Sequence, residues 1–463
     1  MNFSYLRREP GFYRRVFTLA LPVVLQNLIT TSLGFMDTFM VGLVGQEQMS
    51  AVTVANVPIY IIQLIVFGLQ SGSRVLISQF WGRGDRESIN RVMGIGFFVA
   101  GGISTICALT MGLFPRQVLM LITDNARLVE LGTSYIRIVG FSYILNSLSS
   151  IYIGMQQSIE NPRFGMTVFA ISTVCNTAGN YILIFGKLGL PALGITGAAI
   201  ATLTARIVEF LIVLVYALLC RRIPLRPRLL LRPGRDTARS FAKYATPVLF
   251  NETMWGLGTT VMTSILGHMT DSADMLAAYT IMGNIDKFTT VSCFGLAGAT
   301  AVILGKAIGE GTDKDRVYDL SWCLLIVSFL LGLGLAAALA LALPLVFIPY
   351  LYPLFSLSPL ATEAAATLCV VYLILLPLKS FDISNITGVL RSGGDVRMAT
   401  IIDLTPLWCV AVPMAALTAL VLEAPLPLVC LGIYSENICK MPLGVMRLRS
   451  RKWINDVTRR SAS

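Results

Sequence analysis

The stretch VFTLALPVVLQNLITTSLGFMDTFM, residues 16–40, decides the fold class. About 20 consecutive apolar residues span the hydrocarbon core of a bilayer as an α-helix. This stretch is longer than that, and it contains one charged residue, Asp37. Four arginines precede it, as in a signal peptide, but the run is too long for a cleaved leader. The sequence therefore predicts a first transmembrane helix that is retained.

Apolar runs of this kind recur along the whole chain, in which 55% of the residues are hydrophobic and 13% are charged. Soluble domains carry roughly 25% charged residues, so this composition excludes an ordinary soluble protein. We expect an all-α integral membrane protein with twelve transmembrane helices. The predicted spans are 16–40, 51–77, 92–114, 129–155, 165–185, 192–219, 241–267, 275–305, 319–342, 362–389, 397–420 and 426–446.

The positions of lysine and arginine orient these spans, because cytoplasmic loops are enriched in both residues. Termini and loops on one side hold 27 of them, and the other side holds only Arg116, Arg127 and Lys187. Both termini are therefore expected in the cytoplasm. The net charge of +11 follows this loop pattern rather than the basic face of a nucleic-acid-binding domain, so we expect no nucleic-acid partner.

Pairs of similar segments indicate an internal repeat. GLQSGSRVLISQFWGRGD (68–85) aligns with GLAGATAVILGKAIGEGT (295–312), and GMQQSIENPR (154–163) aligns with GVLRSGGDVR (388–397). Each half starts on the same side and holds six spans, so the repeats are parallel. Transporters built from such halves place their substrate site between them.

The repeat also predicts the domain organisation. We expect a six-helix bundle at 1–220, a basic cytoplasmic linker at 221–240 and a second six-helix bundle at 241–463.

Polar residues in two spans of the first half predict a cation-coupling site. Charges inside a membrane are rare and are functional hypotheses by default. Asp37 has no basic residue three or four positions away, and Asn176 and Asn180 share one face of the fifth span. We expect these three residues to bind the coupling ion, although asparagines also join helices by hydrogen bonds alone. The residues expected to line the substrate cavity beside them are Gln26, Asn27, Thr30, Thr31 and Thr173.

The same residues bear on which ion is coupled. A carboxylate buried among neutral groups has its charged form disfavoured, which favours proton coupling through Asp37. Converging carboxylate and amide oxygens also suit a hard cation such as Na⁺. Both ions therefore remain open.

The second half holds further acids. Glu252 in the seventh span lacks a cation nearby in the sequence and is a second candidate for cation coupling. Asp286, Asp382 and Asn385 form a possible additional site, in which Lys379 could neutralise Asp382 on the same helix face. The spacing of Arg206 with Glu209, and of Glu436 with Lys440, allows pairing within a helix, and we expect a structural role for both pairs.

Other chemistry finds no support in the sequence. The nine cysteines lie mostly in apolar stretches without a CxxC pair, and there is a single histidine, His268. Neither a disulfide framework nor a metal site is expected, and no cofactor is expected.

The chain resembles the multidrug and toxic compound extrusion (MATE) family of cation-coupled antiporters. LALPVVLQNLITTSLGFMDTFMVGLVG (19–45) is similar to the first helix of that family, and NTAGNYILIFGKLGLPALGITGAAIAT (176–202) is similar to its helix 5–6 segment. SENICKMPLGVMRLRSRKWIND (435–456) resembles the tail of bacterial members. By this resemblance Asp37 belongs to a cation site that includes asparagines of helix five. Glu252 occupies the position of a helix-seven acid of the NorM branch, and Asp382 only roughly matches the helix-ten acid.

The resemblance implies that the protein exports amphipathic, often cationic organic compounds by alternating access, driven by H⁺ or Na⁺. A monomer in the inner membrane of a bacterium is expected, with small organic molecules and the lipid bilayer as partners. One alternative is a lipid-linked oligosaccharide flippase of the same superfamily. Another is a membrane-embedded enzyme, although the sequence contains no HExxH motif and no nucleophile elbow.

Overall fold

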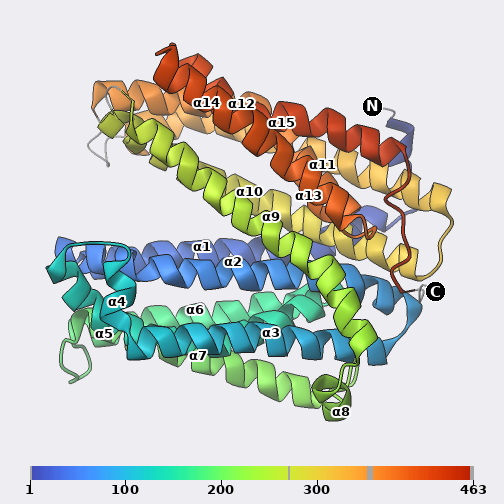
Figure 1. The fold of residues 1–463 in the computed structure, drawn as a ribbon, viewed down its shortest axis with the longest axis horizontal. Helices are drawn as coiled ribbons and strands as arrows, with labels where there is room; N and C mark the ends of the chain where they lie inside the picture. Colours follow the sequence, from blue (N-terminus) through green and yellow to red (C-terminus); the bar gives the residue numbers. More distant parts are fainter. Residues whose placement is uncertain (1–2, 270–271, 352–357, 459–463) are drawn as a thin grey trace. The chain divides into compact units, whose positions relative to one another are not determined.

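The computed structural model describes residues 3–269, 272–351 and 358–458, and these form helices and short connections (Figure 1). The long helices of the first half are α1 (Phe12–Gly42), α2 (Gln46–Arg83), α3 (Arg86–Leu113), α5 (Ala126–Ser158), α6 (Pro162–Phe185) and α7 (Gly194–Leu219). Shorter elements are the 3₁₀ turn η1 (Phe3–Leu6), α4 (Pro115–Met120) and α8 (Pro227–Leu231).

The second half repeats this arrangement with more irregular helices. It consists of α9 (Arg235–Gly267), α10 (Ser272–Gly309), α11 (Lys314–Ala342) and α12 (Pro359–Ile383), then α13 (Val396–Pro406), α14 (Val412–Ala416) and α15 (Leu426–Arg449). π-helical turns extend or join these helices at η2 (Leu343–Leu351), η4 (Ser384–Leu390), η5 (Leu407–Ala411) and η6 (Leu417–Val421).

The predicted all-α membrane fold is confirmed. Within the described residues, ten helical segments are long and apolar enough to cross a membrane. The helices α9 and α15 complete the twelve spans, and both carry additional charged residues such as Glu252 and Lys440. Each predicted span coincides with one of these twelve helical segments to within a few residues.

The repeated sequence ends its helix in the same way in both halves. Gly84 ends α2 in the left-handed region with φ 75°, and the Asp85 side chain then accepts a hydrogen bond from the Ser88 N–H at the start of α3. After α10, Gly311 has φ 76°, and the Asp313 side chain accepts from the Asp315 N–H at the start of α11. A left-handed residue favours glycine, and an aspartate satisfies the unpaired N–H groups of a helix start.

Contacts divide the chain into two compact units, Leu25–Leu249 and Met1–Val24 with Phe250–Ser463. Both divisions fall two residues after a proline inside a helix, Pro22 in α1 and Pro247 in α9. Proline removes a helical hydrogen bond and favours a bend. The first part of each of these two helices is thus grouped with the opposite half of the chain, and the division into bundles at 1–220 and 241–463 stays a prediction.

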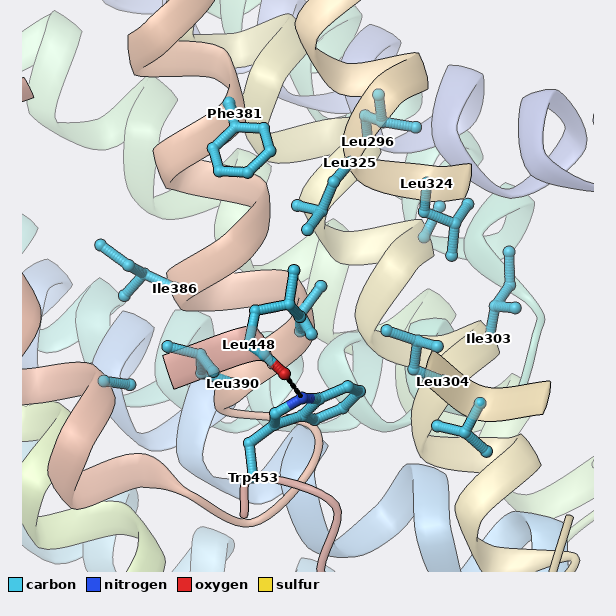
Figure 2. Packing of buried hydrophobic residues seen from close by; sticks show 14 of the residues in the cluster. Leu296, Ile303, Leu304, Leu324, Leu325, Phe381, Ile386, Leu390, Leu448 and Trp453 are labelled. Carbon is cyan, nitrogen blue, oxygen red and sulfur yellow. Dashed lines mark hydrogen bonds between the residues drawn. The ribbon is translucent and has the colours of Figure 1, made fainter. Parts of the chain in front are cut away.

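Each unit has its own apolar core. In the first unit, residues of α1, α2, α5 and α7 such as Val41, Ile59, Ile136 and Ala199 form one buried cluster. In the second unit, Figure 2 shows Trp453, beyond the end of α15, packed among leucine and isoleucine side chains. Trp453 is fully buried, and its Nε1 donates a hydrogen bond to the Leu448 carbonyl at 3.2 Å.

Candidate cation-coupling site

Asp37 lies in the last third of α1 and is joined to α6 and α7 by a chain of hydrogen bonds. Asn180 Nδ2 donates to Asp37 Oδ1 at 2.5 Å and to Asn176 Oδ1 at 3.0 Å. Asn176 Nδ2 in turn donates to Thr202 Oγ1 on α7 at 3.3 Å. The structure thus brings the three predicted residues together and adds Thr202, which the sequence did not single out.

Small residues allow α6 and α7 to approach closely enough for this chain. A Cβ at Gly179 would lie 3.0 Å from the Ala201 Cβ, and one at Gly197 would lie 2.5 Å from the Leu183 carbonyl oxygen. Membrane helices use small residues in this way, because backbones can then approach each other. Gly179 is one residue from Asn180, and Gly197 is five residues from Thr202. These two glycines therefore indicate that α6 and α7 pack closely at the site.

The site combines a carboxylate with a buried amide oxygen. Asn176 is 2% exposed and Asn180 1%, whereas Asp37 is half-buried. Within the described chain, the Asn180 Oδ1 has no hydrogen-bond partner, and Asp37 forms no ion pair with a lysine or arginine. Buried polar atoms nearly always have a hydrogen-bond partner. A proton on the Asp37 carboxylate, or a cation or water at the Asp37 and Asn180 oxygens, would supply that partner.

The residues predicted to line the substrate cavity lie in different surroundings. Gln26 is buried, and its Oε1 accepts a hydrogen bond from Gln157 Nε2 at 3.1 Å within the first unit. Thr173 Oγ1 is buried and has no partner among the described residues. The side chains of Asn27 and Thr31 are half-buried, and Thr30 is exposed. A substrate role for these five residues stays a prediction.

Glu252 has a cation that the sequence did not reveal. Arg391 Nη1 lies 2.9 Å from Glu252 Oε1, and both side chains are largely buried. Arg391 was assigned to a cytoplasmic loop from its sequence position, but the structure buries it directly after η4. The sequence signal was its alignment in the repeat with Gln157, which makes a buried contact with Gln26 of α1 in the first unit.

Asp286 also has an internal cation, and the predicted neutralisation of Asp382 by Lys379 is wrong. Lys379 reaches across to α10 and pairs with Asp286, which also accepts from Tyr372 OH at 2.6 Å and Thr290 Oγ1 at 2.8 Å. Three donors make Asp286 the better counter-ion. Asp382 is only 3% exposed, and neither of its oxygens has a partner in the described chain.

Asn385, three residues beyond Asp382, is similar. Its side chain is fully buried, and neither its oxygen nor its nitrogen has a partner among the described residues. Asp382 and Asn385 therefore resemble the Asn180 oxygen in having unsatisfied buried atoms.

The two predicted pairs within helices are confirmed. Arg206 Nη1 lies 2.5 Å from Glu209 Oε2, and Lys440 Nζ lies 2.8 Å from Glu436 Oε2. Lys440 also pairs with Asp403 of α13 at 2.8 Å, which the sequence did not predict. Four acids of the second half, at 252, 286, 403 and 436, are thus ion-paired with a lysine or arginine, whereas Asp37 has no such pair in the part of the chain that the structure describes.

Comparisons with known proteins agree over nearly the whole chain. A family model described as MatE matches residues 22–182 and 247–417. The uncharacterized transporter YisQ of Bacillus subtilis is 25% identical over 445 residues, covering 95% of this chain and 94% of YisQ. The probable multidrug resistance protein NorM of Thermotoga maritima is 23% identical over 465 residues, covering 97% of this chain and 95% of NorM.

A solved structure described as the outward-facing conformation of a multidrug resistance MATE family transporter has a TM-score of 0.84 to this chain at 20% identity. The match covers 97% of this chain and 98% of the other. At this identity the likeness concerns the fold, which is the twelve-helix fold of two repeats.

Proposed function

Because this chain belongs to the MATE family of membrane transporters, we propose that it exports amphipathic, often cationic organic compounds in exchange for protons that bind at Asp37. Members of the family are transporters and not enzymes, and they need no cofactor. We further propose that the protein acts as a monomer in the inner membrane of a bacterium, with both termini and the 221–240 linker in the cytoplasm.

The observation that carries the proposal is the contrast between Asp37 and the ion-paired acids of the second half, at 252, 286, 403 and 436. An ion pair with a lysine or arginine occupies a carboxylate permanently, so that a mobile proton or cation competes poorly for it. Within the described residues, the partner of the Asp37 carboxylate is the neutral amide of Asn180. It can therefore gain and lose a proton, or a cation, during each transport cycle.

Sodium is the second candidate ion, and it is favoured by a specific observation. The Asn180 Oδ1 and the second oxygen of Asp37 are both available, and Na⁺ needs several converging oxygens. In the second half, Glu252, Asp382 and Asn385 remain secondary candidates for another cation site. Of these, Asp382 and Asn385 have unsatisfied atoms, whereas Glu252 already has Arg391.

The test is efflux of a fluorescent cation such as ethidium from proteoliposomes in which a proton gradient or a sodium gradient is imposed alone. We expect efflux with the proton gradient, and no active efflux in Asp37→Asn. The matched control is Glu130→Gln, an exposed acid of α5 that pairs only at the surface with Arg127. Drive by sodium alone would assign the other ion, and wild-type efflux by a well-folded Asp37→Asn protein would refute the coupling role.

The orientation has a separate test. Single cysteines at exposed positions of the linker, such as Arg232, and of the first turn of α2, such as Glu47, are labelled in intact cells with an impermeant reagent. We expect labelling at Glu47 and none at Arg232. The reverse pattern would place both termini outside.

A further inference from the structure

The first unit contains a second acid inside the membrane, Glu209 of α7, and it is fully buried. Its carboxylate accepts hydrogen bonds from Arg206 Nη1 at 2.5 Å, from Asn146 Nδ2 of α5 at 3.2 Å and from Ser172 Oγ of α6 at 3.3 Å. Three helices thus direct donors at one carboxylate, and Arg206 is the cation among these donors. Arg206 alone neutralises the charge of Glu209, so the two neutral donors, Asn146 and Ser172, are not needed for that purpose.

The pair lies one helical turn from the coupling site on both helices that build it. On α7, Arg206 follows Thr202 by four residues, and on α6, Ser172 precedes Asn176 by four residues. Residues four apart share a helix face. Thr202 is joined to Asp37 through Asn176 and Asn180, so the guanidinium lies one helical turn from the end of this hydrogen-bond chain.

Within the described part of the first unit, four polar side chains of α2 and α5 and three of α6 take part in hydrogen bonds and carry no charge that could hold this guanidinium. From α2 and α5 they are Asn56, Gln63, Tyr135 and Tyr143, with Gln63 Nε2 donating to Tyr143 OH at 2.9 Å and Tyr135 OH donating to Asn56 Oδ1 at 3.5 Å. From α6 they are Ser172, Asn176 and Asn180. Among the charged groups described here, Glu209 and Asp37 are therefore the two acids that can compete for Arg206.

Arginine stays protonated in proteins, and a buried charge without a partner is costly. If Glu209 released the guanidinium, Asp37 at the neighbouring coupling site would be the acid that could replace it. A guanidinium bound at Asp37 would keep its carboxylate charged and exclude the proton or cation that must bind there. The coupling site can remain open only if Arg206 is held elsewhere.

We propose that Glu209 sequesters Arg206, so that Asp37 has no permanent counter-ion. The part of the inference that concerns coupling rests on the proposed function. The competition of Asp37 and Glu209 for Arg206 does not depend on that function. Glu209 and Arg206 are positioning residues in this view, because neither binds the transported ion or the exported compound.

The first experiment compares Glu209→Gln with the double variant Arg206→Gln/Glu209→Gln in proteoliposomes. Glutamine keeps the shape of Glu209 and removes its charge. We expect the outer pH of half-maximal efflux to move lower by about one to three units in Glu209→Gln, because an aspartate beside an arginine keeps its charge to lower pH. The double variant has no arginine to release, and its pH profile should return to that of the wild type.

The second experiment measures thermal stability in detergent and needs no transport. Asp37→Asn is made in the wild type and in Glu209→Gln, which gives a double-mutant cycle. If the released arginine moves to Asp37, Asp37→Asn lowers the melting temperature more in the Glu209→Gln background than in the wild type. This excess should vanish when Arg206→Gln is also present.

The outcomes separate the two proposals. Suppose that Asp37→Asn lowers the melting temperature more in the Glu209→Gln background than in the wild type, while efflux by Asp37→Asn is unimpaired. This result supports sequestration and refutes proton coupling at Asp37. Sequestration is overturned if the two substitutions lower the melting temperature additively and the pH profile of efflux is unshifted in folded Glu209→Gln. If Glu209→Gln does not fold, Glu209→Asp replaces it, because its carboxylate is one methylene further from Arg206. The same changes, but smaller, are then expected, and their absence overturns the inference.

Discussion

The ion pair between Glu252 and Arg391 gives the sharpest prediction about the second unit. Its N–O distance is 2.9 Å, and the exposed fractions of the two side chains are 13% and 3%. Removing one partner of a buried pair strands the other charge, which costs about 3–5 kcal/mol, whereas replacing both partners is often close to neutral. We therefore expect Glu252→Gln to cost about 3–5 kcal/mol of stability, and Glu252→Gln/Arg391→Gln to recover most of this loss.

The first unit holds a neutral contact at a neighbouring position. There Gln157, which aligns with Arg391, donates a hydrogen bond to Gln26 of α1. Gln26 lies four residues after Pro22, whereas Glu252 lies five residues after Pro247, so the two contacts are one residue apart on their helices. Reversible unfolding in bicelles by steric trapping measures the stabilities, and proteoliposome efflux shows whether transport survives. A double variant that is no more stable than Glu252→Gln would refute the reasoning. A stable double variant without transport would show that Glu252 takes part in coupling.

Three further predictions concern single positions. Asn180→Ala removes a hydrogen bond to a carboxylate, worth about 1.5–3 kcal/mol, and we expect it to slow efflux in proteoliposomes roughly tenfold, which is less than the loss in Asp37→Asn. Trp453→Ala empties a fully buried site beyond α15, so stability should fall by about 3–5 kcal/mol, measured by steric trapping; an unchanged stability would mean that this tail does not pack. Gly94→Ala places a Cβ 2.3 Å from the Leu230 carbonyl oxygen of α8, and limited proteolysis should then cut the linker faster than in the wild type.

The sequence could predict the helices because a membrane span is a local property. About 20 apolar residues in a row suffice for a span, and turn residues such as Gly84 and Asp85 mark where one helix ends and the next begins. The pairs Arg206–Glu209 and Glu436–Lys440 were equally accessible, because residues three or four apart on a helix face each other. Asp37, Asn176 and Asn180 were grouped by the same helical periodicity, together with the resemblance to a known family.

Contacts between helices could not be predicted in this way. Arg391 and Glu252 are far apart in the sequence, and a basic residue near a span end is indistinguishable from an ordinary loop arginine. Lys379 was three residues from Asp382, yet the structure pairs it with Asp286 on a neighbouring helix. Spacing shows which residues share a face, but not which helix lies opposite that face. The exchange of the first parts of α1 and α9 between the units escaped prediction for the same reason.

The distribution of charge across the two repeats supports a division of roles between them. Arg391, Lys379 and Lys440 pair with acids of the second unit, so the net charge of each pair stays constant while the transporter changes conformation. In the first unit, Glu209 pairs with Arg206, and Asp37 forms no ion pair among the described residues, so that its charge can change. A transporter needs its coupling site to gain and lose an ion in each cycle. An ion that binds two conformations equally well cannot shift the equilibrium between them. A permanently paired acid cannot meet this requirement, and Asp37 can. Among the described residues, Asp382 of the second unit lacks a hydrogen-bond partner, so the placement of the chain's own cations favours Asp37 as the proposed coupling site and leaves Asp382 as the secondary candidate.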